Sequence, residues 1–311
     1  MAILSATVSR IFVLFLFIFA GYLLVRIKVL PKSSSEVLSK LENNLFIPCL
    51  VLGTFSSNFT VEKIGTAWKL FLISFVLCLL MMLISLIIVH FTSKDQFIRN
   101  IYRYGLVFSN FGFMGNAVVS AVFPDIFFEY LIFTLPFWTM IYVWGVPCLL
   151  IPRKEGDVTF LSRLGSFVNP MFVAMFVGMI IGLANITLPD FISDAVGVSG
   201  DCMSPVSMLL TGVVVATMDL KKVLKTKSIY AVTFIRLLAL PLIALLLCKI
   251  IGVPEVYLIC IVCVLSMPLG LNIMVIPAGY GKDTSVAAGA IVVSHLISAI
   301  TIPFVFWLMT I

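Results

Sequence analysis

Charged side chains are scarce in this sequence. Only 11% of its 311 residues are Asp, Glu, Lys or Arg, while 62% are hydrophobic and the mean hydropathy is +1.21. A water-soluble domain cannot bury so large an apolar fraction, and its surface would aggregate. The composition therefore excludes a soluble globular protein. Uncharged blocks such as 70–89 are long enough to cross a hydrocarbon core of about 30 Å as helices.

Motifs of nucleotide and metal sites are also missing. Gly281-Lys282 lacks the upstream glycine of a P-loop, and no connector is long enough for a soluble domain, which excludes an ATP-driven pump. Cys260 and Cys263 form a CxxC without a second pair or a histidine ligand nearby, so zinc is not predicted. We expect no cofactor, no metal site and no acidic cluster that would hold sodium through carboxylate oxygens.

The apolar blocks predict an all-α polytopic membrane protein with ten transmembrane helices separated by short polar connectors. The predicted spans are 8–27, 35–57, 65–91, 100–123, 127–151, 166–187, 191–218, 228–251, 255–280 and 284–310. The first block has no Ala-x-Ala cleavage site and is followed at once by Arg26 and Lys28. We therefore expect a membrane helix there and not a removable signal peptide.

Lysine and arginine are distributed unequally between the two sides of this arrangement. Fourteen of the twenty fall at odd-numbered connectors, four fall on the opposite side, and Lys40 and Arg236 fall inside spans. Because positive residues are retained on the cytoplasmic side, both termini are expected outside a plasma membrane, or an inner membrane if the source is bacterial. The net charge of +6 is thus topological and does not indicate nucleic-acid binding.

Several features recur in the same order in the two halves of the chain. Pro48 of the second span corresponds to Pro205 of the seventh, and Lys69 and Arg236 enter the third and eighth spans. We therefore predict a 5+5 inverted-topology repeat. Its units are residues 1–151, a cytoplasmic connector 152–165, and residues 166–311.

Spans four and nine contain helix-breaking residues, in SNFGFMGN and SMPLGLN. Pro268 removes an amide donor, and glycine allows the backbone to leave helical geometry. The N-terminus of a half-helix at such a break suits an anion, and asparagine amides add uncharged donors. The candidate substrate-binding residues are Asn110, Gly112, Gly115, Asn116, Ser266, Pro268, Gly270, Asn272 and Arg236. The alternative is that the glycines pack helices and the asparagines bridge them.

Ionisable residues inside the spans are candidates for further roles. Arg236 either attracts an anionic substrate or extends its side chain back to the headgroups. Glu42, Asp201 and His295 are candidates for proton coupling. The alternatives are solvation at the membrane interface for the two acids and a hydrogen bond to a carbonyl for the histidine.

An enzyme is the competing class. Residues 197–200 spell GVSG, a pattern that presents a serine nucleophile in intramembrane serine proteases, with His295 as the base for Ser199. The residues after His295 and the two similar halves do not fit such a protease. We expect no enzymatic activity.

The sequence resembles the auxin efflux carrier family, which includes plant PIN-type carriers and bacterial malate-permease-like proteins. The resemblance runs the whole length and is carried by NFGFMGN, the Pro48 and Pro205 segments, and MPLGLN followed by AGYGKDTSVAAGAIVVSHLISAITIP at 278–303. It implies a scaffold of spans 1, 2, 6 and 7, a transport domain of spans 3–5 and 8–10, and a substrate held between them where the broken helices cross. Two features depart from the plant carriers, namely Gly115-Asn116-Ala117 in place of a crossover proline and a short connector in place of a long cytoplasmic loop.

We therefore expect a secondary transporter of small organic anions, such as malate or auxin-like acids, that works by elevator-type alternating access. Its expected partners are the lipid bilayer, the substrate, a coupled proton or sodium ion, and a second copy bound through the scaffold. A channel, or a transporter-like receptor without carrier activity, is the alternative.

Overall fold

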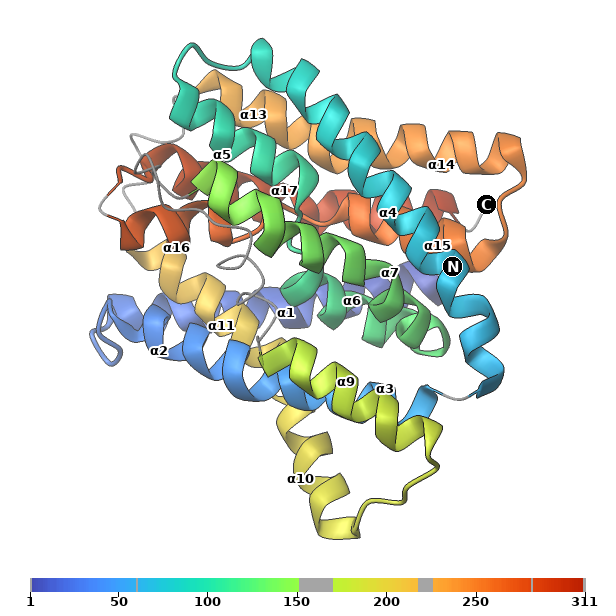
Figure 1. Ribbon diagram of the computed structural model, residues 1–311. Coiled ribbons are helices and arrows are strands. Elements are labelled where there is room, and N and C mark those ends of the chain that lie inside the picture. The colour runs from blue at the N-terminus through green and yellow to red at the C-terminus, as the bar shows by residue number, and fades with distance from the viewer. Residues whose placement is uncertain (1, 60, 151–169, 218–225, 281, 310–311) are drawn as a thin grey trace, which may run out of the picture.

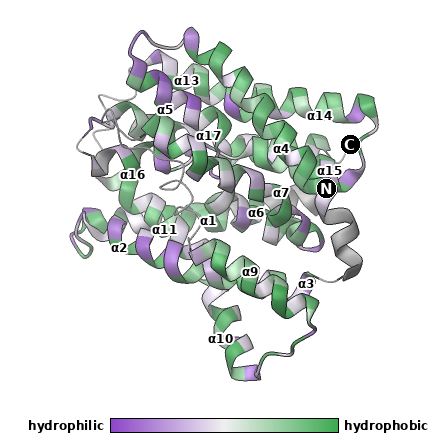
Figure 2. Cartoon of the chain, viewed as in Figure 1, coloured by the Kyte–Doolittle hydropathy of each residue, from purple (hydrophilic) through white to green (hydrophobic). Residues whose placement is uncertain are grey.

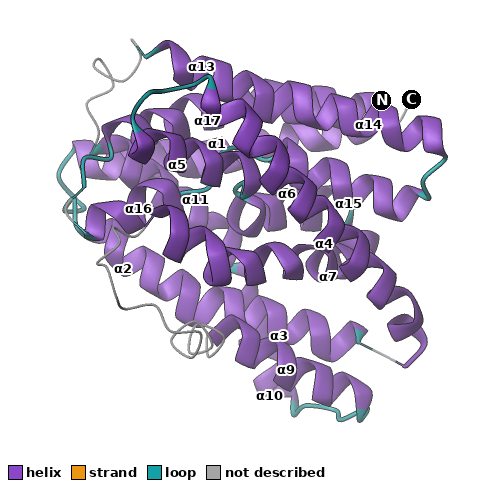
Figure 3. Cartoon of the chain, turned by 45° about the horizontal axis from the view of Figure 1, so that its top comes forward, coloured by secondary structure: helices purple, strands orange, loops and turns teal. Residues whose placement is uncertain are grey.

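The computed structural model describes residues 2–59, 61–150, 170–217, 226–280 and 282–309. Within these ranges the chain is helical and contains no strand (Figure 3). The predicted connector 152–165 lies outside the described residues.

The described residues of the first half form eleven helical segments, four of which are π- or 3-10 helices. They are α1 (Ala2–Arg26), α2 (Ser34–Leu41), η1 (Glu42–Phe46, π), α3 (Ile47–Asn58), α4 (Val61–His90), α5 (Gln96–Val107), η2 (Phe111–Gly115, π), α6 (Asn116–Val122), η3 (Pro124–Ile126, 3-10), α7 (Phe127–Met140) and η4 (Ile141–Leu150, π).

The described residues of the second half also form α-helices and a π-helical segment. Its described segments are α9 (Pro170–Leu183), α10 (Asp190–Asp201), α11 (Met203–Ala216), α13 (Lys227–Phe234), η6 (Ile235–Ala239, π), α14 (Leu240–Ile251), α15 (Glu255–Ser266), α16 (Asn272–Gly279) and α17 (Ser285–Met309).

Every predicted span is mainly helical in its described residues. Among the described residues, five helical runs are apolar and long enough to cross a membrane: Trp68–His90, Pro124–Leu150, Asp190–Ala216, Lys227–Ile251 and Ser285–Met309. The shorter apolar helices include Phe111–Val122 and Glu255–Ser266, which belong to the two spans predicted to be broken.

The connections between helices gather at two opposite ends of the molecule. The connections 27–33 and 91–95 lie at one end in Figure 1, whereas 184–189 and 252–254 lie at the other. The two chain termini lie together at this second end (Figures 1 and 3). Hydrophobic residues cover the helices between these ends, and hydrophilic ones gather mostly at the connections (Figure 2). This is the arrangement expected of a chain that crosses a membrane repeatedly.

Two helix pairs pack with their backbones in contact. A Cβ atom added to Gly21 of α1 would lie 2.2 Å from the carbonyl oxygen of Leu209 in α11, and one added to Gly212 would lie 1.9 Å from that of Ile18. In the α3–α9 pair, a Cβ on Gly182 would lie 2.7 Å from the carbonyl oxygen of Phe59. Small residues allow such close approach of membrane helices.

Pro48 and Pro205 occupy corresponding local positions. Pro48 stands in the first turn of α3, directly after the π-helical segment η1, and Pro205 stands in the first turn of α11, directly after the junction with α10 at Cys202. The chain is helical before each proline, and its missing N–H coincides with the π-helical segment η1 in one case and with the turn at Cys202 in the other.

Candidate functional site

Two interruptions of the helices meet in the centre of the molecule. The first, residues 108–110, separates α5 from η2, and the second, residues 267–271, separates α15 from α16. Ser109 and Leu269 form an isolated antiparallel β-bridge, and the amide of Asn110 donates to the carbonyl of Pro268 at 2.7 Å. The hydroxyl of Ser109 also donates to the carbonyl of Val264 at 2.8 Å. The two breaks predicted in spans four and nine therefore exist and lie against each other.

Arg236 is fully buried beside these interruptions. Its Nε and two terminal nitrogens donate to the carbonyls of Met267, Leu106 and Val264 at 3.2, 2.9 and 2.7 Å. Those carbonyls belong to the last turns of α5 and α15 and to the start of the second interruption. Helix C-termini leave carbonyls unpaired and carry a partial negative charge, which a cation stabilises. Arg236 is thus committed to the main chain, and the alternative of a side chain reaching the headgroups is wrong.

Asn110 caps the half-helix that follows the first interruption. Its Oδ1 accepts from the amide of Met114 at 3.5 Å, and its Nδ2 lies 3.0 Å from Nε2 of His295 in α17. Asn116, by contrast, has helical backbone angles at the start of α6 and continues η2 without a gap. The free N-terminus in span four therefore begins at Asn110, six residues before Asn116.

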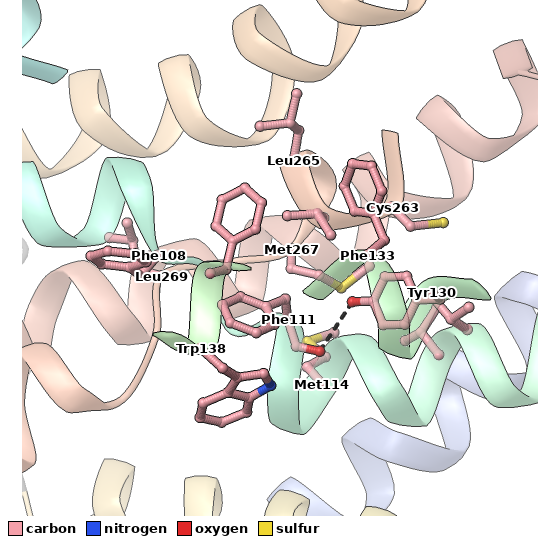
Figure 4. Close-up of a cluster of buried hydrophobic side chains, with 14 of the residues drawn as sticks. Phe108, Phe111, Met114, Tyr130, Phe133, Trp138, Cys263, Leu265, Met267 and Leu269 are labelled. Carbon is pink, nitrogen blue, oxygen red and sulfur yellow. Dashed lines mark hydrogen bonds between the residues drawn. The ribbon is translucent and has the colours of Figure 1, made fainter. Parts of the chain in front are cut away.

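Gly112 and Gly115 lie in η2, so the expectation that they let the backbone leave helical geometry is wrong. Gly115 has φ −62° and ψ −48°, and neither glycine has a positive φ. They are small because aromatic side chains of α7 lie against them. A Cβ on Gly112 would lie 2.2 Å from the ring of Trp138, and one on Gly115 would lie 2.3 Å from the hydroxyl of Tyr130. That hydroxyl donates to the carbonyl of Phe111 at 3.0 Å (Figure 4).

The remaining predicted residues lie in the second interruption or directly beside it. Ser266 ends α15 and bonds back to the carbonyl of Val262 at 2.7 Å. Gly270 faces the first interruption, where a Cβ would lie 3.2 and 3.3 Å from the carbonyl oxygens of Phe108 and Ser109. Asn272 begins α16, and its Nδ2 donates to the hydroxyl of Tyr104 at 2.9 Å.

A small pocket opens at the point where these segments meet. It is lined by residues 108–113 of the first break and by residues 270–272 of the second, with Tyr104, Trp138 and Ile141 completing the wall. The N-termini of both half-helices, Phe111–Val122 and Asn272–Gly279, thus face one cavity. The positive ends of two helix dipoles favour an anion there.

A second small pocket is also lined by Trp138, which therefore borders both. Its walls come from α3 and α9 on one side and from α6 and α7 on the other. Its lining is apolar apart from Thr134, the Trp138 indole and Asn116, whose Oδ1 is buried without a hydrogen-bond partner in the described part of the chain. A buried acceptor of this kind costs free energy unless a ligand or water supplies a donor.

The two acidic candidates for proton coupling lie in different environments. Glu42 in η1 is fully buried, so interfacial solvation is wrong for this residue. Asp201 at the end of α10 is exposed, which agrees with solvation. Neither residue lines the two pockets.

His295 bonds to a carbonyl, as one of the two interpretations of the sequence expected. Its Nδ1 lies 2.8 Å from the carbonyl oxygen of Ile291, and its Nε2 faces Asn110. Both ring nitrogens are therefore engaged. Ser199 lies on α10, which projects away from α17 in both views of the chain (Figures 1 and 3). The structure does not assemble the proposed serine–histidine pair.

Comparison with protein families agrees with this architecture. A family profile described as membrane transport protein matches residues 6–306, which is nearly the whole chain. The chain belongs to this family. The resemblance to auxin efflux carriers and malate-permease-like proteins is thereby confirmed. A search of curated proteins gave no match. As a member of a membrane transport family with many apolar helices, the protein is a multi-pass membrane transporter.

Sequence reasoning missed several residues of this transporter's central site. Tyr104, Trp138 and Ser294 touch the interruptions or line a pocket, yet each looks like an ordinary helix residue in the sequence. A usable signal existed for Trp138 alone, because a large aromatic residue in span five would fit a glycine in span four. Figure 4 shows the aromatic and methionine side chains that gather around the two breaks.

Proposed function

We propose that this protein is a secondary carrier of small organic anions. The observation that carries the proposal is that two half-helix N-termini, at Asn110 and Asn272, line one pocket. Their N–H groups and amides bind a carboxylate without bringing a charged side chain into the membrane. Arg236 supports this arrangement indirectly, because it neutralises the carbonyl ends of α5 and α15.

The second pocket narrows the class of substrate. Asn116 Oδ1 has no described donor, so the ligand that satisfies it carries a hydroxyl or another donor in addition to its carboxylate. A hydroxy acid such as malate has both groups, and we propose it as the first substrate to test.

We further propose the 5+5 inverted repeat and an elevator-type movement. The scaffold would consist of α1, α2, α3, α9, α10 and α11, and the transport domain of the remaining helices. Figure 1 supports this division for α2, α3, α9, α10 and α11, which lie together below the helices of the second set. The pocket at Asn116 is walled by α3 and α9 of the proposed scaffold and by α6 and α7 of the proposed transport domain. A substrate there would be exposed to opposite sides in turn as one part moves past the other.

Coupling and assembly complete the proposal. The buried Glu42 is our candidate for a coupled proton, with sodium as the alternative ion. The exposed apolar side chains of α10, Phe191 and Val198, are available for a homodimer contact through the scaffold. We place the protein in the plasma membrane, or the inner membrane of a bacterium, with both termini outside.

Counterflow of labelled malate into proteoliposomes preloaded with unlabelled acids tests the function. Accumulation supported by internal malate and less by succinate, which lacks the hydroxyl, is the expected result. Asn272→Ala should reduce uptake about tenfold, the effect of one buried hydrogen bond to a carboxylate, and Asn116→Ala should reduce it about fivefold, the effect of one hydrogen bond to a neutral hydroxyl. Asn44→Ala is the matched control, because this exposed amide bonds only to the carbonyl of Lys40 in the described structure.

The same assay separates the competing functions. If folded protein showed no counterflow with any carboxylate, the carrier assignment would be wrong. Binding of malate without counterflow would favour a receptor. Conductance without saturation would favour a channel.

A further inference from the structure

His295 and its neighbour Ser294 stand on α17 at the place where this helix meets the two interruptions. Both side chains are buried. Ser294 Oγ donates to the carbonyl of Ile291 at 3.0 Å, and Nδ1 of His295 lies 2.8 Å from the same oxygen. A carbonyl oxygen only accepts, so Nδ1 carries the ring proton.

These bonds decide what each side chain offers to the interruptions. Because the Ser294 proton is directed to Ile291, its oxygen accepts from the amide of Leu269 at 3.3 Å. Because Nδ1 of neutral His295 is the donor, Nε2 is an acceptor, and it lies 3.0 Å from Nδ2 of Asn110. A single main-chain carbonyl thus makes both side chains acceptors, one toward each interruption.

The bond from Asn110 to His295 fixes the orientation of the asparagine amide. Its Nδ2 faces α17 and its Oδ1 faces the amide of Met114. An amide nitrogen has two hydrogens. The second one is left for a ligand in the pocket that Asn110 lines.

We infer that His295 is a positioning residue of the anion site: through Asn110 it determines that an N–H, and not a carbonyl oxygen, faces the bound substrate. The inference rests on the proposed carrier function. It assigns His295 a role as a neutral, tautomer-fixed acceptor and not as a carrier of the coupled proton.

Spectroscopy tests the hydrogen bond without any assumption about transport. The chain has two histidines, and His90 is exposed, so protein labelled with ¹⁵N-histidine in lipid vesicles gives one reference signal and one signal of interest. We expect His295 to show protonated Nδ1 and unprotonated Nε2, and Asn110→Ala to shift the Nε2 resonance alone. An Nε2-protonated ring, or no shift in the variant, would overturn the inference.

Counterflow kinetics test the positioning role. His295→Ala should raise the KM for the carboxylate about fivefold to tenfold, as expected for one lost hydrogen bond, while the maximal rate changes less than about twofold. His295→Gln should restore most of the affinity, since its side-chain oxygen can accept from Asn110 at the place of Nε2. In an Asn110→Ala background, His295→Ala should add little, because the two residues act as one unit.

Ser298→Ala is the matched control on the same helix. Ser298 is buried one turn further along and bonds only to the carbonyl of His295 in the described structure. An equal rise in KM in this variant, or no rescue by glutamine, would show a purely structural role. If wild-type protein gave the expected histidine spectrum but no counterflow, the carrier function would fail and the hydrogen-bond assignment would stand.

Discussion

The two interruptions break their helices by different means. The first, residues 108–110, contains neither proline nor glycine, and its own side chains form the bonds: Ser109 donates to Val264, and Asn110 caps the next half-helix and reaches His295. The second, residues 267–271, contains Pro268 and Gly270 and is held mainly through its main chain.

Main-chain groups of the second interruption receive partners from elsewhere. The carbonyl of Met267 accepts from Arg236, that of Pro268 accepts from the amide of Asn110, and the amide of Leu269 donates to Ser294. The comparison teaches that a break inside a membrane does not require a particular residue. It requires a partner for each backbone group that the helix no longer pairs.

The largest effect is expected from the removal of Arg236, whose side chain donates to carbonyls beside both interruptions. Arg236→Ala leaves the carbonyls of Leu106 and Met267 without their described partner and should reduce the free energy of unfolding by about 3 kcal/mol or more. The measurement is the melting midpoint of purified protein in detergent. Lys69→Ala is the control, because Lys69 holds the corresponding place in span three but is exposed. Equal losses in both variants would contradict the capping role.

A change at Gly112 affects the first interruption through a side chain. Gly112→Ala places a Cβ against the Trp138 ring and should cost about 1–3 kcal/mol of stability. Because the obstacle is the outer part of one ring, Trp138→Phe should recover most of the loss in the double variant. The melting midpoints of the two single variants and the double variant measure this coupling. Simple additivity would mean that the ring is not the obstacle.

The corresponding change in the second interruption meets a backbone. Gly270→Ala brings a Cβ within 3.2 Å of the carbonyl oxygen of Phe108, and the two breaks have to separate slightly, at a cost of about 1 kcal/mol. Unlike Gly112→Ala, it should not be rescued by truncating any neighbouring side chain. A screen of truncations at Leu269 and Trp138, read by the melting midpoint, checks this. Full rescue by either one would contradict a main-chain contact.

The smallest effect is expected at Tyr104. Tyr104→Phe removes the acceptor for Asn272 Nδ2 but keeps the ring that lines the pocket. Since a ligand or water can replace this acceptor, we expect a rise in KM of about twofold or threefold in malate counterflow and no change in melting midpoint. A rise in KM as large as that expected for His295→Ala would mean that Asn272 depends on its hydrogen bond to Tyr104 as much as Asn110 depends on its hydrogen bond to His295.

The helices could be predicted from the sequence because hydropathy and connector chemistry act locally. The existence of both breaks was also visible, through Pro268 in one case and the glycine–asparagine cluster in the other. The place of the first break was not. Glycine at 112 and 115 indicated a non-helical backbone, but these glycines instead make room for the side chains of Trp138 and Tyr130. No local sequence pattern shows that those two side chains lie close.

The role of Arg236 was hidden for a similar reason. Its acceptors are main-chain carbonyls, 28 to 130 residues away in the chain, and carbonyls have no sequence signature. Asn110 and His295 were both candidates, but 185 residues separate them and their hydrogen bond depends on the tertiary fold. Asn116 was predicted beside the break and instead faces the pocket between α3 and α7.

The glycine contacts described for α1–α11 and α3–α9 have a mechanical consequence. At each of these glycines, a main-chain carbonyl oxygen of the partner segment lies where a Cβ atom would otherwise be. Sliding α1 along α11 by one turn, about 5.4 Å, would bring Phe17 or Val25 to the place of Gly21, where no Cβ fits. These two pairs therefore resist shear, and any displacement that carries a substrate across the membrane has to occur along other helix contacts.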